Sequence, residues 1–242
     1  MYQLLGLEQF AELVSGVSTT DEGNMAEKWG DKEEVNGNRR RFLDKLGINP
    51  EDCVIASLSG GTKVIIVGRK DKTKYIEGDA LITKEKGVGL FMVTADCLPV
   101  VMFDKTKEIL SLVHLGWKGV DGKLAEKVIK RFCGFGSKPE DILVLIGPGV
   151  HKESYKWDPK SVMQKDKKDW KPFLEVKDGY VYVDVPGYVK KQLSDNGVRE
   201  KNIKDCGIDT GVDKRYFSHY RSKRNGEPEG RFATVVIMKG KI

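Results

Sequence analysis

The sequence predicts an α+β fold in which mixed β-sheets outnumber the helices. Short apolar runs rich in Val and Ile recur along the chain, usually between clusters of Gly, Asp and Lys, and this pattern is typical of buried strands. Only three segments show the periodicity of amphipathic helices. Several strands follow one another without a helix between them, which favours mixed sheets over a doubly wound parallel sheet. We expect one domain over residues 1–242, because a single domain of this class can reach about 250 residues.

The first predicted element is a helix over residues 39–46, with an Asn before it as N-cap and Gly47 as its stop. Strands are then expected at 54–56, 64–67, 89–93, 100–103 and 109–113. The second half of the chain should contain a helix at 122–132, strands at 142–146 and 181–184, a helix at 187–193 after Pro186, and a last strand at 233–238. The charged runs at 69–74 and 164–169 are interpreted as solvated surface segments.

The composition excludes several classes of protein. A hydrophobic fraction of 39% is enough for a sizeable core, and the charged fraction of 32% is spread along the chain, so disordered, collagen-like and coiled-coil proteins are excluded. With 42 Lys and Arg against 36 Asp and Glu, the net charge is +6. This mild excess suits small anionic ligands such as phosphate, but it lacks the basic clustering expected of a nucleic-acid-binding protein.

The N-terminal stretch carries acidic residues within its apolar run and no basic region before it, unlike a secretory signal. No apolar run approaches the roughly 20 residues of a membrane span. The cysteines are too widely separated to suggest a disulfide framework; they are Cys53, Cys97, Cys133 and Cys206. We therefore expect a cytoplasmic protein with free thiols and no membrane partner. A monomer is expected because no additional interaction segment is visible.

Cys97 and His114 are the strongest chemical signal in the sequence. Each comes where an apolar strand gives way to a turn containing Pro or Gly, and they are 17 positions apart, a spacing that fits a hairpin placing them side by side. Such a pair has two uses: the imidazole can activate the thiol as a nucleophile, or both side chains can bind zinc. A buried cysteine and a core histidine are the structural alternatives. His151, on a glycine-containing loop, is a further candidate for the same site.

Several motifs, spread over nearly the whole chain, together resemble one known family. They are Gly16–Thr19, Asn38-Arg39, Gly78–Thr83, Ala95-Asp96-Cys97-Leu98-Pro99, His114-Leu115-Gly116-Trp117-Lys118-Gly119, Ile146–Pro148 and Phe217–Arg221 with Gly230-Arg231. The family is that of the multi-copper polyphenol oxidase, or laccase-domain, proteins, whose better-supported activity is purine nucleoside phosphorylase. The Ala-Asp-Cys-Leu-Pro and His-x-Gly-Trp-[Arg/Lys]-Gly motifs, in this order, make the resemblance highly specific.

The resemblance implies a layered αββα domain with mixed sheets and a zinc site made of one Cys and two His, with copper as the alternative metal. It also implies phosphorolysis of adenosine, inosine, guanosine or 5′-methylthioadenosine, with adenosine deamination reported alongside. Cys97 matches the Cys ligand and His114 the second His ligand, and both would be catalytic. For phosphate we expect contacts from Lys118 and Arg221, since cationic donors bind its oxygens strongly.

The sequence departs from the family at three places. Gly60 stands where the first His ligand is expected, Thr20 replaces an Arg, and Gly149 replaces a Cys. A catalytic zinc normally has three protein ligands, and Thr cannot replace the charged fork of an Arg. Two alternatives to the phosphorylase therefore stay open. One is a catalytically impaired homologue that only binds a ligand or partner, and the other is a metal-free hydrolase using Cys97 and His114.

Overall fold

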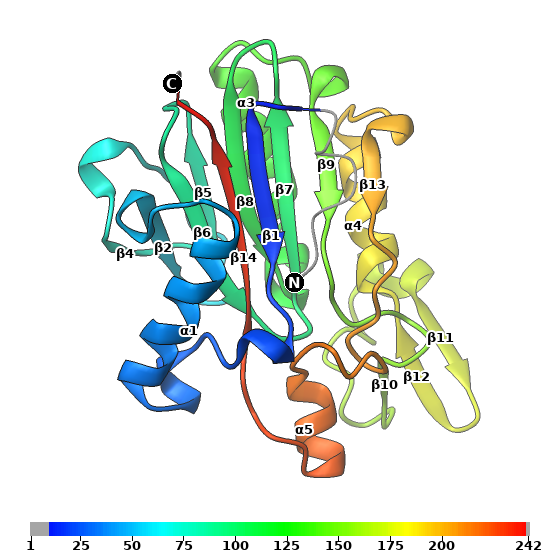
Figure 1. Ribbon diagram of the computed structural model, residues 1–242. Helices are drawn as coiled ribbons and strands as arrows, with labels where there is room; N and C mark the ends of the chain where they lie inside the picture. The colour runs from blue at the N-terminus through cyan, green and yellow to red at the C-terminus, as the bar shows by residue number, and fades with distance from the viewer. Residues whose placement is uncertain (1–9, 241–242) are drawn as a thin grey trace.

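The computed structural model describes residues 10–240, which form two large sheets packed face to face with helices on both outer sides (Figure 1). The five-stranded sheet has the order β1 (Leu13–Val17), β14 (Phe232–Met238), β6 (Gly89–Thr94), β2 (Cys53–Ser57) and β4 (Tyr75–Glu77). The six-stranded sheet has the order β13 (Ile203–Asp205), β9 (Leu143–Ile146), β7 (Leu98–Asp104), β8 (Ile109–Leu115), β5 (Ala80–Thr83) and β3 (Val64–Ile66). Both sheets combine parallel and antiparallel pairs.

A smaller sheet and five α-helices complete the described part of the chain. The small sheet has the order β10 (Lys156–Trp157), β12 (Tyr180–Val183) and β11 (Leu174–Lys177). The helices are α1 (Lys32–Lys45), α2 (Trp117–Asp121), α3 (Leu124–Gly134), α4 (Val185–Asp195) and α5 (His219–Asn225). The α+β class with mixed sheets, predicted from the order of elements, is confirmed.

Alternation along the strands divides the core into three layers. On β5, Leu81 faces the other sheet, whereas its neighbours Ala80 and Ile82 face the helices, because successive strand side chains point to opposite faces. The outer face of the six-stranded sheet is covered by α2, α3 and α4, and α1 covers the five-stranded sheet through Phe42 and Leu43. The layers therefore run helix, sheet, sheet, helix, as the resemblance implied.

The first helix starts earlier than the sequence analysis placed it. Asp31 accepts hydrogen bonds from the amides of Glu33 and Glu34 and so caps α1, which extends over Gly37 without interruption. The charged run at 164–169 was also interpreted incompletely. Gln164, its first residue, is buried, and Trp170, the residue that follows the run, is fully buried, so this segment is held against the protein at both ends.

The open end of the β7–β8 hairpin, opposite its turn, is the part of the fold that positions the candidate site. The two strands pair antiparallel from Leu98 opposite Leu115 to Asp104 opposite Ile109. This is the hairpin anticipated from the spacing of Cys97 and His114. Because Cys97 immediately precedes β7 and His114 lies near the end of β8, both residues come to the same edge of the six-stranded sheet.

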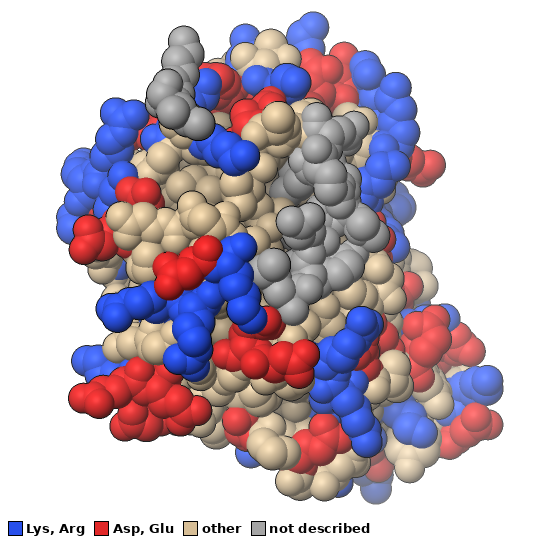
Figure 2. All heavy atoms as spheres, in the orientation of Figure 1, with Lys and Arg blue, Asp and Glu red and all other residues tan. Residues whose placement is uncertain are grey.

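The surface shows no segregation of charge on the face drawn in Figure 2, where basic and acidic side chains interleave. Many are paired, for example Lys72 with Asp52 and Lys86 with Glu108. Within residues 10–240, no helix is both long enough and apolar enough to cross a membrane.

The contact between the two sheets should carry a large part of the stability. Leu81 is fully buried, and its Leu81→Ala variant should lose about 2–5 kcal/mol of unfolding free energy because a cavity replaces the lost methyl groups. Urea unfolding measures this difference in free energy, provided that the variant and the wild type have the same m-value. The matched control is Val176→Ala on β11, where the side chain is 77% exposed and the change should stay within about 0.5 kcal/mol. Equal losses at the two positions would contradict the assigned core.

A second prediction concerns Glu22, a buried carboxylate in the turn after β1. Its carboxylate accepts hydrogen bonds from the amide and hydroxyl of Thr19 and from Lys45. Burial would raise the pKa of Glu22, but these bonds lower it from 4.5 to about 2. Because the folded state favours the ionised form, Glu22 stabilises the protein above pH 4.5, and this stabilisation is lost as the pH falls toward 2.

The Glu22→Gln variant should therefore be less stable than the wild type near neutral pH, with the difference shrinking over that acidic range. Unfolding measured at several pH values follows the difference directly. A gap that stays constant down to the most acidic sample would show that the charge of Glu22 contributes nothing.

Candidate active site

Cys97 and His114 lie side by side at the end of the β7–β8 hairpin. Continuing the pairing of Leu98 with Leu115 by one residue sets Cys97 opposite Gly116, and His114 lies two residues before Gly116 on the same face. A β-carbon placed on Gly116 would lie 2.8 Å from the Cys97 Sγ and 3.6 Å from the His114 Nε2. The absence of a side chain at Gly116 therefore leaves the sulfur and the imidazole facing each other.

Asp79, at the start of β5, holds the other side of the His114 ring. Its Oδ1 lies 3.0 Å from the His114 Nδ1 and accepts from the Gly60 amide at 2.8 Å. Its Oδ2 accepts from the Ser59 hydroxyl at 2.7 Å and from the Gly61 amide at 2.8 Å. Because an ionised carboxylate only accepts hydrogen bonds, Nδ1 must carry the hydrogen. This fixes the ring orientation and directs Nε2 toward Cys97.

The electrostatics of the pair follow from these contacts. Burial alone would lower the pKa of His114, but the charge of Cys97 and the hydrogen bond to Asp79 raise it to about 9. Burial would raise the pKa of Asp79, yet hydrogen bonds from His114, Ser59 and Gly61 lower it to about 2. The surroundings thus favour an ionised carboxylate beside a charged imidazole.

The loop that presents Cys97 is held by Asp96. Asp96 has a φ of +74°, a left-handed conformation that is costly for a residue with a side chain and that persists where the surroundings enforce it. Its carboxylate accepts from the Thr210 hydroxyl at 2.8 Å and from the Tyr220 amide at 2.7 Å, and its carbonyl accepts from the Val150 amide. Three distant segments therefore fix the position of the neighbouring Cys97.

An aromatic cluster that the sequence analysis missed adjoins the Asp96 loop. Tyr155 packs edge-on against Trp157 and Tyr220, with ring centroids 5.5 and 5.4 Å apart, and the amide of Tyr220 donates to the Asp96 carboxylate. Burial, and after it the charge of Cys97, raise the pKa of Tyr155 above its usual value. The sequence offered only a Tyr-x-Trp pair near a glycine loop, and nothing in it shows that these rings meet Tyr220.

The two residues expected to bind phosphate, Lys118 and Arg221, lie in different surroundings. Lys118 is exposed on the first turn of α2, immediately after the Gly116 turn, and has no carboxylate partner among residues 10–240. Its Nζ lies 5.8 Å from the centroid of the Trp117 ring. The ammonium of Lys118 is therefore not committed to a carboxylate among the described residues, and the residue lies two positions after Gly116.

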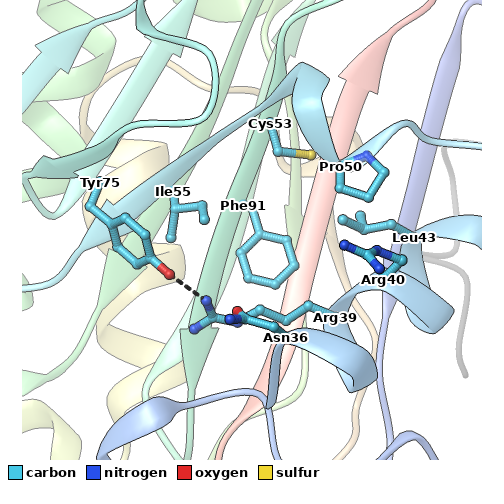
Figure 3. A pocket seen from close by; sticks show the side chains of 9 residues that line it. All are labelled: Asn36, Arg39, Arg40, Leu43, Pro50, Cys53, Ile55, Tyr75 and Phe91. Atoms are coloured by element: carbon cyan, nitrogen blue, oxygen red, sulfur yellow. Dashed lines mark hydrogen bonds between the residues drawn. The ribbon is translucent and has the colours of Figure 1, made fainter. Parts of the chain in front are cut away.

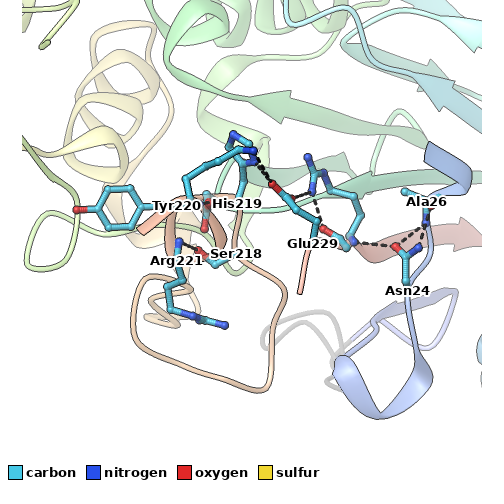
Figure 4. A network of polar contacts seen from close by, with 11 residues as sticks. Asn24, Ala26, Ser218, His219, Tyr220, Arg221 and Glu229 are labelled. Carbon is cyan, nitrogen blue, oxygen red and sulfur yellow. Dashed lines mark hydrogen bonds and ion pairs between the residues drawn. The ribbon is translucent and has the colours of Figure 1, made fainter. Parts of the chain in front are cut away.

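Arg221 is instead built into the protein. It is only 6% exposed, and its guanidinium donates to the carbonyls of Thr210, Asp213 and Tyr216 and pairs with Glu227. Figure 4 shows Arg221 leaving α5 in a different direction from His219, which contacts Glu229. These contacts make Arg221 a support for the loop that holds Asp96, and they leave Lys118 as the exposed cation.

The metal implied by the resemblance does not fit the residues present. Within residues 10–240 there is no group of three or more His, Cys, Asp or Glu side chains able to hold a metal ion. Cys97 and His114 supply two donors, whereas a catalytic zinc normally takes three from the protein. At the third position Gly60 has no side chain, and a β-carbon there would meet nothing within 4 Å.

No neighbouring donor replaces the missing ligand. The carboxylate of Asp79 already takes four hydrogen bonds, and that of Asp96 is committed to Thr210 and Tyr220. His151, the other candidate, has a buried Nε2 without a hydrogen-bond partner among the described residues, but it does not join Cys97 and His114 in one group. The zinc or copper expected from the resemblance therefore lacks its third protein ligand.

The departure at Gly149 has a packing reason. A β-carbon on Gly149 would lie 2.4 Å from a methyl group of Leu98 and 2.9 Å from the Asp96 carbonyl oxygen. The Cys expected here by resemblance would not fit beside this arrangement of the Asp96 loop. The absence of a side chain at Gly149 therefore lets the chain pass close to the Asp96 loop.

A cavity of about 220 Å³ lies elsewhere, between α1 and the outer face of the five-stranded sheet (Figure 3). Among its polar groups, Arg39 donates to the Met25 carbonyl and the Tyr75 hydroxyl. Burial raises the pKa of the Cys53 thiol in its wall to about 12, which makes that thiol a poor nucleophile. The hairpin, where a thiol meets an imidazole, is therefore the stronger candidate site.

Restoring the missing ligand should create a metal site. Gly60→His places an imidazole in open space, at a backbone φ of +70°, which His tolerates better than most residues. After incubation with zinc and dialysis, elemental analysis should find about one zinc per chain in this variant and much less in the wild type.

Gly60→Asn is the matched control, because it imposes the same backbone conformation without a strong zinc ligand. Stoichiometric zinc in the wild type, removed by Cys97→Ala, would show instead that two donors suffice here.

The sequence profile described as multi-copper polyphenol oxidoreductase laccase matches residues 9–239. A purine nucleoside phosphorylase of Clostridium acetobutylicum is 31% identical over 209 residues, covering 86% of this chain and 85% of that protein. A purine nucleoside phosphorylase of Deinococcus radiodurans is 27% identical over 214 residues, covering 88% of this chain and 81% of that protein.

Solved structures show the same fold. YlmD from Geobacillus stearothermophilus superimposes with a TM-score of 0.85 at 26% identity, covering 96% of this chain and 93% of that one. The Bacillus licheniformis hypothetical protein YfiH gives a TM-score of 0.84 at 22% identity, covering 98% and 96%. On the extent of the profile match and the similarity of these relatives, the chain belongs to the multi-copper polyphenol oxidoreductase laccase family.

Proposed function

We propose that the protein is a purine nucleoside phosphorylase-like enzyme that cleaves adenosine, inosine, guanosine or 5′-methylthioadenosine with phosphate. The observation that carries the proposal is the pairing of Cys97 and His114 at the hairpin edge, in a chain whose relatives bear the name purine nucleoside phosphorylase. Adenosine deamination at the same site and a cytoplasmic location belong to the same proposal.

The roles of the residues follow from their positions. His114, oriented by Asp79, is the group placed to give a proton to the departing purine. The exposed Lys118 is the cation for phosphate, since its ammonium has no competing carboxylate among the described residues and point charges of this kind bind phosphate well. Tyr155, in the aromatic cluster with Trp157 and Tyr220, offers an aromatic edge against which a base can pack. No step in this scheme requires a metal.

The test is phosphate-dependent release of free base and ribose 1-phosphate from the four nucleosides, followed by chromatography. His114→Ala should lower turnover by about 10²–10⁴-fold, the usual contribution of a proton-transfer residue. If none of the four nucleosides is cleaved by the wild type, the catalytically impaired homologue, which binds a ligand without turning it over, replaces this proposal.

Lys118 gives a separate prediction. The Lys118→Ala variant should raise the KM for phosphate by about tenfold, equivalent to about 1.4 kcal/mol of lost binding, with less effect on the KM for the nucleoside. The control is Lys177→Ala on β11, which removes an exposed lysine from the three-stranded sheet and should leave both constants unchanged. A larger rise in the KM for the nucleoside than in the KM for phosphate would show that Lys118 does not bind phosphate.

A further inference from the structure

Three chemically distinct side chains line up across the hairpin edge in the order thiol, imidazole, carboxylate. Cys97 immediately precedes β7, His114 lies on β8 and Asp79 immediately precedes β5, so three neighbouring parts of one sheet each supply one group. The imidazole has the carboxylate on Nδ1, at 3.0 Å, and the sulfur on the Nε2 side. A nucleophile, a base and a group that orients the base are thereby in sequence.

The surroundings of Asp79 make it a fixed support. It is fully buried, and the amides of Gly60 and Gly61 hold both of its oxygens together with the Ser59 hydroxyl. The same backbone stretch that lacks a metal ligand thus supplies donors to the carboxylate. His114 in turn is bound to Asp79 through its own backbone amide, which donates to the Asp79 carbonyl at 2.7 Å.

The thiol is accessible, whereas the other groups are enclosed. Cys97 is half-buried, the His114 side chain is 12% exposed and that of Asp79 is not exposed at all. Among the remaining cysteines, Cys53 is buried, Cys133 is exposed on α3 and Cys206 is half-buried like Cys97. None of the three has a histidine partner among residues 10–240. Among the described cysteines, only Cys97 therefore combines partial exposure with an oriented imidazole.

We propose that Cys97, His114 and Asp79 form a metal-independent catalytic triad that hydrolyses acyl compounds, esters or amides, through a thioester on Cys97. The proton of the Cys97 thiol is first held on the His114 Nε2, and the sulfur then attacks the acyl carbon. The bond from carbon to the leaving oxygen or nitrogen breaks, and His114 gives its proton to the leaving group. Water then attacks the thioester and yields a proton to the now neutral His114. The carbon–sulfur bond breaks, the carboxylic acid leaves, and the proton on His114 is again shared with the Cys97 sulfur.

This activity is independent of nucleoside phosphorolysis, and its first test therefore uses no nucleoside. Metal-free protein is treated with limiting iodoacetamide near neutral pH, and alkylation of each cysteine is followed by mass spectrometry. Cys97 should react at least about tenfold faster than the more exposed Cys133, because an adjacent imidazole promotes the thiolate. Cys53 and Cys206 are internal controls of low reactivity, since burial raises the pKa of each thiol to about 12.

The second test uses p-nitrophenyl acetate as the acyl probe. Release of nitrophenolate should begin with a burst, and the trapped protein should carry one acetyl group on Cys97. Both signals should disappear in His114→Gln, whose thiol remains present, and persist in Cys133→Ser. Chelator treatment should leave them unchanged.

The Gly116→Ala variant tests whether the sulfur and the imidazole must touch, because it keeps both residues and disturbs only the contact between them. Its methyl would intrude 2.8 Å from the Cys97 Sγ, while the backbone φ of −79° is one that Ala adopts freely. Alkylation of Cys97 and the acetyl burst should both fall by about tenfold or more, while circular dichroism remains that of the wild type.

Two results would overturn the triad. One is alkylation of Cys97 at or below the rate of Cys133 in metal-free protein. The other is acetylation that survives in His114→Gln or requires added zinc. Phosphorolysis without acyl-enzyme formation would support the proposed phosphorylase and refute the triad. Acyl-enzyme formation without phosphorolysis would support the triad and refute the phosphorylase, so the two proposals can fail separately.

Discussion

The site depends on one buried carboxylate. Asp79 accepts hydrogen bonds from the Ser59–Gly61 loop and from the His114 ring, so it joins a loop after β2 to a strand in the other sheet. A buried charge is costly unless every lone pair finds a donor. The hydrogen bonds to this carboxylate therefore fix the position of the loop. They also fix the orientation of the imidazole, which is one of the donors.

The second constraint is the strained Asp96. Its left-handed backbone turns the chain directly before β7, so that Cys97 lies opposite Gly116. The cost is offset by the Thr210 hydroxyl and by the amide of Tyr220 at the start of α5. Arg221 then holds the carbonyls of the 210–216 loop. A residue far from the thiol in sequence thus supports it through two successive hydrogen-bonded layers.

The sequence was sufficient where the determining interactions are local. Alternating apolar strands predict the mixed sheets, and the spacing of Cys97 and His114 predicts their hairpin. Asp79 could be recognised only as part of a motif, because its partners come from residues 59–61 and from His114. Arg221 was expected to bind phosphate because a sequence shows a cation but not the carbonyl groups that surround it. Helix α5 escaped notice since its seven residues are held by Ser218 and Asp96 rather than by an amphipathic pattern.

The choice between metal chemistry and thiol chemistry comes down to Gly60. In metal sites, a carboxylate behind a histidine orients the ring and strengthens it as a ligand. In a triad, the same carboxylate orients the ring as a base. Asp79 serves either purpose without moving, because its contact with the His114 Nδ1 leaves Nε2 and the Cys97 sulfur to meet a metal ion or each other. With no imidazole at Gly60, only two of these donors remain for a metal, whereas the nucleophile, the base and its support are all present. Among the described residues, the site therefore lacks a third metal ligand, whereas it holds the thiol, the imidazole and the carboxylate that the proposed triad requires.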